Sequence, residues 1–264
     1  MKRDDQLSSV ARIGALLRAL ASAGSNGDST TELARNAGVP RPSAHRILSA
    51  LLQEGFVDRS QRGRWYLGPE LYILGTTAAA RYDVSDHARR SVHRLASATA
   101  ESAFFSAKRG DETVCLLRED GSFPIRSFVL YEGARFPLGV VSSGLAVLAF
   151  LPDAEVDRYL ERAELSERWG SGFEERLMRE RIAATRRTGF ALNPGLVVEG
   201  SWGMAAAVFD VEQVPRWALT LTGIESRFRP ARQAELGKLL LDEAHLLTTA
   251  LAKTAIAREV VERL

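Results

Sequence analysis

The pattern of apolar and polar positions predicts a short helical region at the start of the chain. Between residues 7 and 23, apolar side chains recur every three or four positions, which is typical of a helix with one packed face. We expect the following side chains to point inward: Val10, Ile13, Leu16, Leu17 and Leu20. The polar, glycine-containing stretch 24–29 then ends this helix.

A second helix is predicted directly after this stretch. Ser29 and Glu32 have the spacing of a capping box, in which each residue's side chain bonds to the backbone of the other. Leu33, Ala34 and Ala37 would then point inward. Gly38 follows, a residue suited to a helix end that needs a positive φ. We therefore expect a short helix closed by a tight turn.

The stretch 40–55 predicts a third helix, with one apolar and one polar face. Its apolar positions are Ile47, Leu48, Leu51 and Leu52, and its polar positions are Ser43, Arg46, Ser49 and Gln53. Two short helices joined by a glycine turn, the second with a free polar and basic face, form a helix-turn-helix pattern. The second of the pair would lie in the DNA major groove.

Residues 56–68 predict two short strands around the turn Gln61-Arg62-Gly63. Arg59, Arg62 and Arg64 would project from this hairpin, and a basic wing beside a recognition helix normally contacts phosphates or the minor groove. We therefore expect a winged helix-turn-helix domain over residues 1–68, ended by Gly68-Pro69.

Residues 69–83 are predicted to form a linker helix with an apolar stripe at Leu71, Leu74, Ala78 and Tyr82. Two interpretations of this stripe stay open. The stripe can help to form dimer contacts, or it can pack against the chain's own first helix.

Residues 84–264 change to a mixture of helices and strands. Helices are predicted over residues 84–100, 142–151, 153–162, 173–188 and 230–261, and Val92 and Leu95 of the first of them would point inward. The helix 142–151 is apolar, whereas 153–162 and 173–188 are charged. Strands are predicted over residues 102–109, 112–119, 125–132, 204–210 and 216–223. Consecutive strands joined by tight turns at 110–111 and 120–121 indicate an antiparallel sheet, so the fold class is α+β and not doubly wound.

Composition and charge agree with this organisation. Residues 1–68 carry ten Lys or Arg against six Asp or Glu, whereas the remainder carries 25 against 27, so the basic excess lies with the predicted DNA-reading helix. No apolar run approaches the roughly 18 residues needed to span a bilayer, and the start lacks the apolar centre of a signal peptide. We expect a cytoplasmic protein without membrane association.

Several motifs resemble the IclR-type transcriptional regulators over nearly the whole chain. They are VARIGALLRAL, TTELARNAGVPRPSAHRILSALLQEGFV, YLGPELYILG, FPLGVVSSGLAVLAFLP and TRRTGFALNPGLVVEGSWGMAAAVFD. The resemblance implies a GAF-like effector-binding and oligomerisation domain over 84–264, a homodimer or homotetramer, and control of transcription by a small molecule that is often an organic acid. A dimer would bind double-stranded DNA at a pseudo-palindromic operator.

The resemblance also implies DNA-facing residues. Arg41, Ser43 and Arg46 match the family's positions on the recognition helix, where an Arg can pair with guanine or hold a phosphate. For His45 we expect a partly buried structural role or a phosphate hydrogen bond. Thr30 and Thr31, at the start of the second helix, could bind phosphate, and simple helix capping explains them equally well.

A candidate effector site begins at Ser142 and Ser143, where the start of an apolar helix suits a carboxylate. The resemblance adds the positions matching Asn193, Gly203, Thr220 and Thr222 to the pocket. Thr220 and Thr222 share one face of a strand. Capping and ordinary strand placement are the structural alternatives for the serines and threonines. Leu145 stands where the family commonly has Lys, and Asn193 where an acidic residue is frequent, while Trp202 adds an aromatic neighbour. We therefore expect a ligand that is larger or more apolar than a two-carbon acid.

Enzymatic chemistry has no support in the sequence. Neither a G-x-S-x-G nor an H-E-x-x-H motif occurs, and His45, His87, His93 and His245 lack metal-ligand spacing. The single cysteine, Cys115, lies in an apolar strand, where a buried inert thiol is expected. We therefore expect no enzymatic activity, cofactor or metal. The remaining alternative is a DNA-binding regulator whose second domain only oligomerises.

Overall fold

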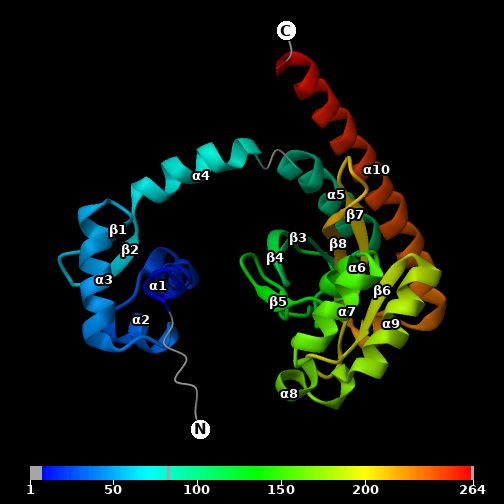
Figure 1. Ribbon diagram of the computed structural model, residues 1–264, viewed down its shortest axis with the longest axis horizontal. Coiled ribbons are helices and arrows are strands. Elements are labelled where there is room, and N and C mark those ends of the chain that lie inside the picture. Colours follow the sequence, from blue (N-terminus) through cyan, green and yellow to red (C-terminus); the bar gives the residue numbers. More distant parts are fainter. Residues whose placement is uncertain (1–7, 82–83, 263–264) are drawn as a thin grey trace. The chain divides into compact units, whose positions relative to one another are not determined.

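The computed structural model describes residues 8–81 and 84–262, and the chain divides into two compact units, residues 1–83 and 84–264. The first unit contains three helices, a two-stranded hairpin and a fourth helix (Figure 1). Its elements are α1 (Ser9–Ala23), η1 (Gly24–Asn26), α2 (Thr30–Asn36), α3 (Arg41–Gln53), β1 (Val57–Arg59), β2 (Trp65–Leu67) and α4 (Pro69–Arg81). The antiparallel pairing of β1 and β2 forms the predicted wing. The N-terminal unit is therefore a winged helix-turn-helix.

The core of the first unit is formed by apolar residues of α1, α2 and α3 that pack around Trp65 of the wing. Leu16, Leu33, Leu48 and Trp65 have no exposed surface. Val10, by contrast, is 77% exposed, so its predicted inward position is wrong. Val10 lies in the first turn of α1. Leu52 is also exposed, because it lies near the end of α3, beyond the buried Leu48 and Leu51.

The predicted helix boundaries follow from their capping residues. Ser29 and Glu32 form the complete capping box, and Gly38 adopts a φ of +64° at the turn before α3. The pKa of Glu32 is lowered to about 2 by a hydrogen bond with Asp28 and by hydrogen bonds from Ser29. The same contact with Glu32 raises the pKa of Asp28. Glu32 therefore stays ionised and keeps α2 capped over the physiological pH range.

The linker helix α4 exposes much of its apolar surface. The side chains of Tyr72, Ile73 and Leu74 are 76%, 54% and 48% exposed. Of the predicted inward positions, Leu71 is half-buried, and the prediction for Leu74 is wrong. The side chain of Ala78 and the whole of Tyr82 lie outside the described residues, as does Leu7, the predicted start of the first helix.

The second unit is built on a six-stranded antiparallel sheet in the order β5-β4-β3-β8-β7-β6. Its helices are α5 (Val84–Thr99), α6 (Ser142–Ala149), α7 (Asp153–Arg162), α8 (Leu165–Trp169), α9 (Glu175–Thr188) and α10 (Pro230–Glu262); its strands are β3 (Ser102–Arg109), β4 (Glu112–Glu119), β5 (Arg135–Pro137), β6 (Phe190–Pro194), β7 (Ser201–Phe209) and β8 (Pro215–Ile224). The turns η2 (Ser171–Phe173) and η3 (Glu225–Arg227) complete it. The predicted α+β class with an antiparallel sheet is confirmed.

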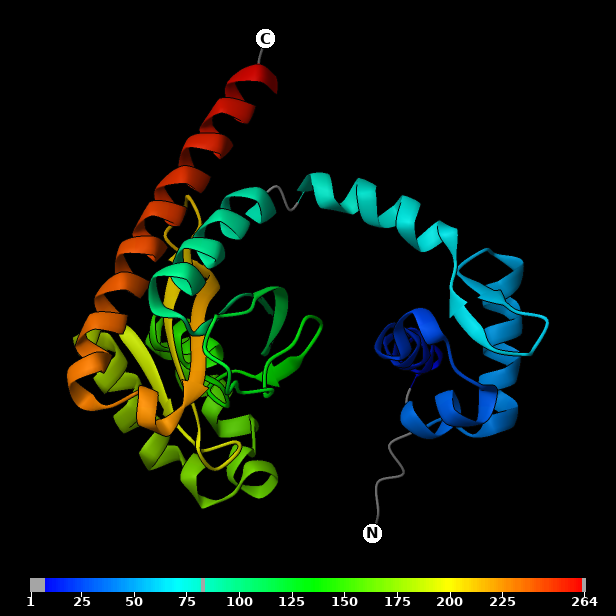
Figure 2. The same ribbon diagram turned by 180° about the vertical axis from the view of Figure 1, so that it is seen from behind.

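Alternating strand residues build two separate cores, one on each face of this sheet. Phe104 and Ala205 belong to the core on the α6 face, whereas Phe105 and Met204 belong to the core on the other face. Figure 2 shows α5 and α10 lying over that second face. Both faces are therefore covered by helices, and polar side chains in the middle of the sheet, such as Thr220, are buried.

Three elements of the second unit differ from the sequence-based expectations. Backbone pairing with the edge of β4 begins only at Gly133, whose N–H donates to the Cys115 carbonyl. Residues 125–132 form no strand, because the Arg118 N–H further along this edge donates to the Glu132 side chain at 3.2 Å and not to a backbone carbonyl. The third strand is instead the short β5. The strand β6 and the helix α8 were not predicted, because each spans only five residues and shows no periodic pattern.

Candidate functional site

The outer surface of α3 carries the predicted DNA-reading residues. Arg41, His45 and Arg46 are exposed, and Ser43 is half-buried at the edge of this surface. The Arg41 Nε donates a hydrogen bond of 3.1 Å to the Thr31 hydroxyl, which links the start of α3 to the start of α2. Guanidinium groups held at a helix surface can reach phosphates or base edges in a major groove.

The wing is tied to α3 through Trp65. The guanidinium of Arg59 lies 4.9 Å from the centre of the Trp65 ring, and the His45 ring meets the same indole edge-on at 6.4 Å. His45 is exposed, so the expected partly buried position is wrong, although its ring contacts Trp65. Arg62 is exposed at the turn of the hairpin. The wing and the recognition helix therefore form one continuous surface, held together by their contacts with Trp65.

Two of the predicted DNA contacts have other roles. Arg64 donates from Nε to the Asn26 carbonyl at 2.9 Å and from Nη2 to the Gly27 carbonyl at 2.8 Å, so it fastens the wing to the loop before α2 and does not project from it. Thr30 is buried, and its hydroxyl accepts a hydrogen bond of 2.8 Å from the Trp65 Nε1. The Thr30 hydroxyl therefore belongs to the core and is not free to bind a phosphate.

Replacing Thr30 by valine is expected to destabilise the first unit by roughly 1–3 kcal/mol, because the buried Trp65 indole N–H loses its acceptor while the volume of the side chain is kept. Native-state amide hydrogen exchange of the buried residues of α1, α2 and α3 at increasing urea concentration measures this loss for the first unit alone. Thr31→Val is the matched control, because it removes a hydroxyl one residue later whose hydrogen bond with Arg41 is exposed and contributes less. Equal stabilities of the two variants would contradict the assignment of Thr30 to the core.

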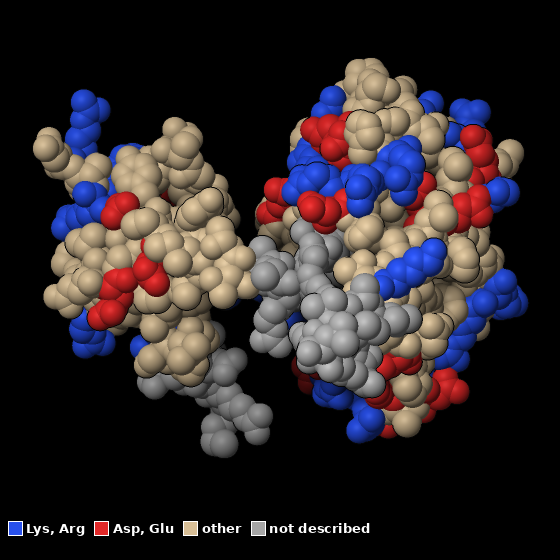
Figure 3. Space-filling model, turned by 90° about the horizontal axis from the view of Figure 1, so that it is seen from above, with Lys and Arg blue, Asp and Glu red and all other residues tan. Residues whose placement is uncertain are grey.

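Part of the free positive charge of the first unit lies on α3 and the wing. Within the described residues, Arg41, Arg46, Arg59 and Arg62 form no ion pair with a carboxylate. Figure 3 shows basic side chains standing out at the rim of this unit, on the left, with acidic residues on the face between them; over the second unit, acidic and basic residues are interspersed. Uncompensated guanidinium groups around a recognition helix attract the phosphate backbone of a nucleic acid.

A small inner cavity lies at the start of α6 in the second unit. It measures about 20 Å³, which is room for about one water molecule. Predicted effector residues line it together with Trp202: Ser142, Asn193, Gly203 and Thr222. The first-turn N–H groups of a helix have no partner within the helix, so α6 offers hydrogen-bond donors at this place. The fold thus brings four of the six predicted effector residues, which are far apart in the chain, to one cavity.

The protein itself uses some of these predicted residues. Asn193 donates from Nδ2 to the Val140 carbonyl at 2.7 Å and accepts from the Leu196 N–H at 3.0 Å, so its amide braces the loop after β6. Ser143 has no exposed surface, and its hydroxyl lies 3.4 Å from that of Thr113. A Cβ at Gly203 would lie 2.9 Å from the Ser142 Oγ, so the glycine makes room for that hydroxyl.

The two threonines of β8 are the unsatisfied groups of this site. The hydroxyls of Thr220 and Thr222 are both buried and have no hydrogen-bond partner in the described residues. The two side chains share the α6 face of the sheet, and Thr222 lines the inner cavity whereas Thr220 is not among its lining residues. A buried hydroxyl without a partner is unfavourable. Thr222 is therefore a hydrogen-bonding group available to a ligand.

A second, outer cavity of about 690 Å³ lies beside the inner one. Its lining includes Arg126, Ser127, Phe128, Val198, Ser201 and Glu225. None of these residues was predicted as part of a site. The cavity was not predicted, because residues 125–132 were interpreted as a strand. In a strand the side chains point alternately to the two faces of the sheet, so no cavity lined by this segment was expected. The exposed apolar Phe128 within this polar-flanked segment was the one available signal.

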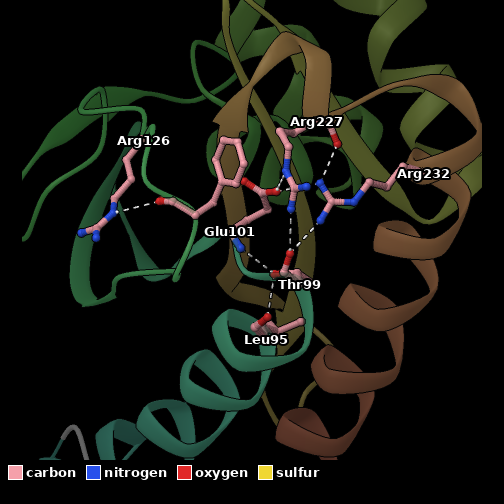
Figure 4. Close-up of polar contacts among 7 residues, drawn as sticks. Leu95, Thr99, Glu101, Arg126, Arg227 and Arg232 are labelled. Atoms are coloured by element: carbon pink, nitrogen blue, oxygen red, sulfur yellow. Dashed lines mark hydrogen bonds and ion pairs between the residues drawn. The ribbon is translucent and has the colours of Figure 1, made fainter.

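A buried ion cluster ties the end of α5 to the start of α10. The side chain of Glu101 is 1% exposed and accepts hydrogen bonds from the Arg227 Nε at 2.7 Å and the Arg232 Nη1 at 2.6 Å. Both arginines also donate to the Thr99 carbonyl (Figure 4). The sequence analysis missed this cluster, because the two arginines lie 126 and 131 positions after Glu101 in the chain.

The described residues hold no catalytic or metal-binding arrangement that we can identify. Within them, no group of three or more His, Cys, Asp or Glu side chains could hold a metal ion. Burial raises the pKa of the Cys115 thiol to about 12, as expected for an inert cysteine. In the same part of the chain, no helix combines the length and the apolar character that a membrane span requires.

Comparisons with known proteins give the same picture. Residues 9–61 match the family described as "IclR helix-turn-helix domain", and residues 76–249 match "Bacterial transcriptional regulator IclR C-terminal". The glycerol operon regulatory protein of Streptomyces griseus is 30% identical over 230 residues, covering 85% of this chain and 87% of that protein.

Solved structures agree. The IclR transcriptional regulator of Alicyclobacillus acidocaldarius is 25% identical, with a TM-score of 0.75 over 92% of this chain and 98% of that chain. An IclR homologue of Microbacterium hydrocarbonoxydans, solved in complex with 4-hydroxybenzoate, has a TM-score of 0.74 at 21% identity and covers 92% and 99% of the two chains. These relatives are regulators and not enzymes. This chain belongs to the IclR family of DNA-binding transcriptional regulators.

Proposed function

We propose that this chain binds a pseudo-palindromic operator as a homodimer or homotetramer, and that a small organic acid held in the second unit changes its affinity for that operator. The observation that carries the ligand part is the buried Thr222 hydroxyl, which lines a cavity at the start of α6 and has no hydrogen-bond partner among the described residues. The proposal places the protein in the cytoplasm, where the DNA is.

Operator recognition is assigned to α3 and the wing. Arg41 and Arg46 would read base edges or hold phosphates from the major groove, with Ser43 and His45 beside them. Arg59 and Arg62 would hold phosphates next to the groove, with Thr31 at the start of α2. Support comes from the exposure of these four arginines and from the absence of carboxylate partners for them in the described residues.

Self-association would use the linker helix. Tyr72, Ile73 and Leu74 expose apolar surface on α4, and consecutive large apolar side chains in water favour contact with a partner. A second copy of the chain then presents a second α3. Two recognition helices require half-sites whose centres are separated by a multiple of one DNA turn, about 34–36 Å.

The ligand class is an organic acid, with a single aromatic ring preferred. A carboxylate would be met by the first-turn N–H groups of α6 and by the hydroxyls of Ser142 and Thr222. The partly buried Trp202 beside them favours an apolar body. The complex of the Microbacterium homologue with 4-hydroxybenzoate supports the same class for this chain.

Thr222→Val is expected to abolish most of the thermal stabilisation by benzoate or 4-hydroxybenzoate without lowering the stability of the free protein. Valine keeps the shape of the side chain, and the hydroxyl that it removes has no hydrogen-bond partner in the part of the chain that the structure describes. The measurement is a thermal-shift titration, in which stabilisation must grow with ligand concentration. Thr220→Val, which removes an equally unpartnered hydroxyl on the same strand, is the matched control. Equal ligand responses in the two variants would remove Thr222 from the site.

A further inference from the structure

The two cavities of the second unit meet at one hydrogen bond. The hydroxyls of Ser127 and Ser201 lie 2.6 Å apart, and the Val129 N–H donates to Ser127 at 3.3 Å. Ser127 lines the outer cavity, whereas Ser201 and Val129 line both cavities. The Ser127–Ser201 pair thus lies at the boundary between the two cavities and joins the loop before β5 to the start of β7.

Neither cavity alone is suited to the proposed ligand. The inner cavity of about 20 Å³ has the hydrogen-bonding groups but holds no more than about one water molecule. The outer cavity of about 690 Å³ falls in the range of small-molecule sites, about 300–1,000 Å³. It has enough room for an aromatic ring.

The outer cavity is a poor place for a carboxylate. Glu199 and Glu225 line it, and the one guanidinium there, that of Arg126, already pairs with Asp120 at 2.8 Å. Apolar side chains offer contacts for a ring instead, since Phe128 and Val198 line it and are 72% and 53% exposed. Charge and apolar contact together orient an aromatic acid with its carboxylate inward and its ring outward.

We propose that the two cavities are the two halves of one ligand site, and that the Ser127–Ser201 hydrogen bond closes the passage between them. A single-ring aromatic acid would separate the two serines, place its carboxylate near Ser142 and Thr222, and leave its ring against Phe128 and Val198. This proposal rests on the proposed function, and it adds the outer half of the site and the route of entry.

A reversible crosslink across the passage provides the test. The double variant Ser127→Cys/Ser201→Cys replaces two hydroxyls 2.6 Å apart by thiols that can form a disulfide bond of about 2.05 Å. Cys115 does not interfere, because it is buried and its pKa of about 12 keeps it unreactive. Benzoate and 4-hydroxybenzoate are titrated against the oxidised and the reduced forms, with thermal stabilisation as the readout.

The expected result is loss of at least nine-tenths of the stabilisation in the oxidised form and its recovery after reduction. The two single-cysteine variants, which cannot form this disulfide, should respond to the acids in either redox state. An oxidised double variant that responds as fully as the reduced one would overturn the proposal. If the wild-type chain binds DNA but responds to neither acid, the proposed ligand function itself fails, which is a distinguishable outcome.

A second variant tests the outer half without a crosslink. Ser226→Trp, at an exposed position of the outer cavity, is expected to fill this cavity. The benzoate concentration needed for a given thermal stabilisation should then rise at least tenfold. Ser97→Trp, at an exposed position of α5, is the matched control. An unchanged response of Ser226→Trp would show that the ligand does not use the outer cavity.

Discussion

Glu101→Gln is expected to destabilise the second unit by roughly 2–4 kcal/mol. Removing one partner of a buried ion pair typically costs about 3–5 kcal/mol, because the remaining charge is left without compensation. Here the carboxylate is 1% exposed, while Arg227 and Arg232 are 29% and 24% exposed, so partial solvation of the guanidinium groups lowers the expected loss. Glutamine keeps the size of the side chain and changes only its charge.

Urea unfolding measures this loss, and the probes are favourably placed. Three of the four tryptophans, Trp169, Trp202 and Trp217, lie in the second unit, so its unfolding dominates the fluorescence change. Glu180→Gln is the matched control, because the ion pair of Glu180 with Arg176 is exposed and is expected to contribute less than about 1 kcal/mol. A Glu101→Gln variant as stable as Glu180→Gln would mean that the cluster does not hold α5 to α10.

Arg46→Ala is expected to weaken operator binding by about tenfold or more, with no effect on self-association or on the response to aromatic acids. A bidentate contact between an Arg and a base is worth roughly 1–3 kcal/mol. The Arg46 side chain is exposed and unpaired in the described residues, so its removal does not disturb the core. Fluorescence anisotropy with labelled operator DNA, at two salt concentrations, gives the affinity and its salt dependence.

The control for this experiment is Arg187→Ala, which removes the same charge from an exposed position of α9 in the other unit. If both variants bind operator as tightly as the wild-type chain, Arg46 is a solvated surface charge. A loss of affinity confined to the preferred sequence would indicate base reading by Arg46, whereas an equal loss on all sequences would indicate a phosphate contact.

The parts of the fold that local sequence chemistry dictates could be predicted from the sequence. The capping box at Ser29 and Glu32 and the positive φ of Gly38 set α2 and the turn before α3, and strict helical spacing identified the buried Leu33 and Leu48. The antiparallel sheet followed in the same way from strands joined by tight turns.

The parts that depend on distant partners could not be predicted. A wing arginine normally projects, yet Arg64 donates to carbonyls 37 and 38 positions away, and Thr30 accepts from an indole 35 positions away. Residues 125–132 read as a strand because their composition suits one, but the edge of β4 is taken by the residues that follow them. The outer cavity exists because that segment is a loop.

The candidate effector residues show both situations at once. Positions carried over from the family resemblance meet at the inner cavity, since Ser142, Gly203 and Thr222 all line it. Their hydrogen-bonding state was not predictable from the sequence. The Asn193 amide bonds within the protein, whereas the Thr222 hydroxyl has no partner among the residues that the structure describes. Only the packed structure separates a structural polar group from one that is available to a ligand.

The central claim is that an aromatic acid in the second unit changes the affinity of the first unit for DNA. The most direct measurement is the affinity for operator DNA, selected by the protein from a random library, in the presence of increasing 4-hydroxybenzoate at constant salt. We predict that the acid shifts the operator affinity of the wild-type chain and of Thr220→Val, and leaves that of Thr222→Val unchanged. An operator affinity that stays constant while the acid stabilises the protein would contradict the claim, because bound ligand would then be uncoupled from DNA.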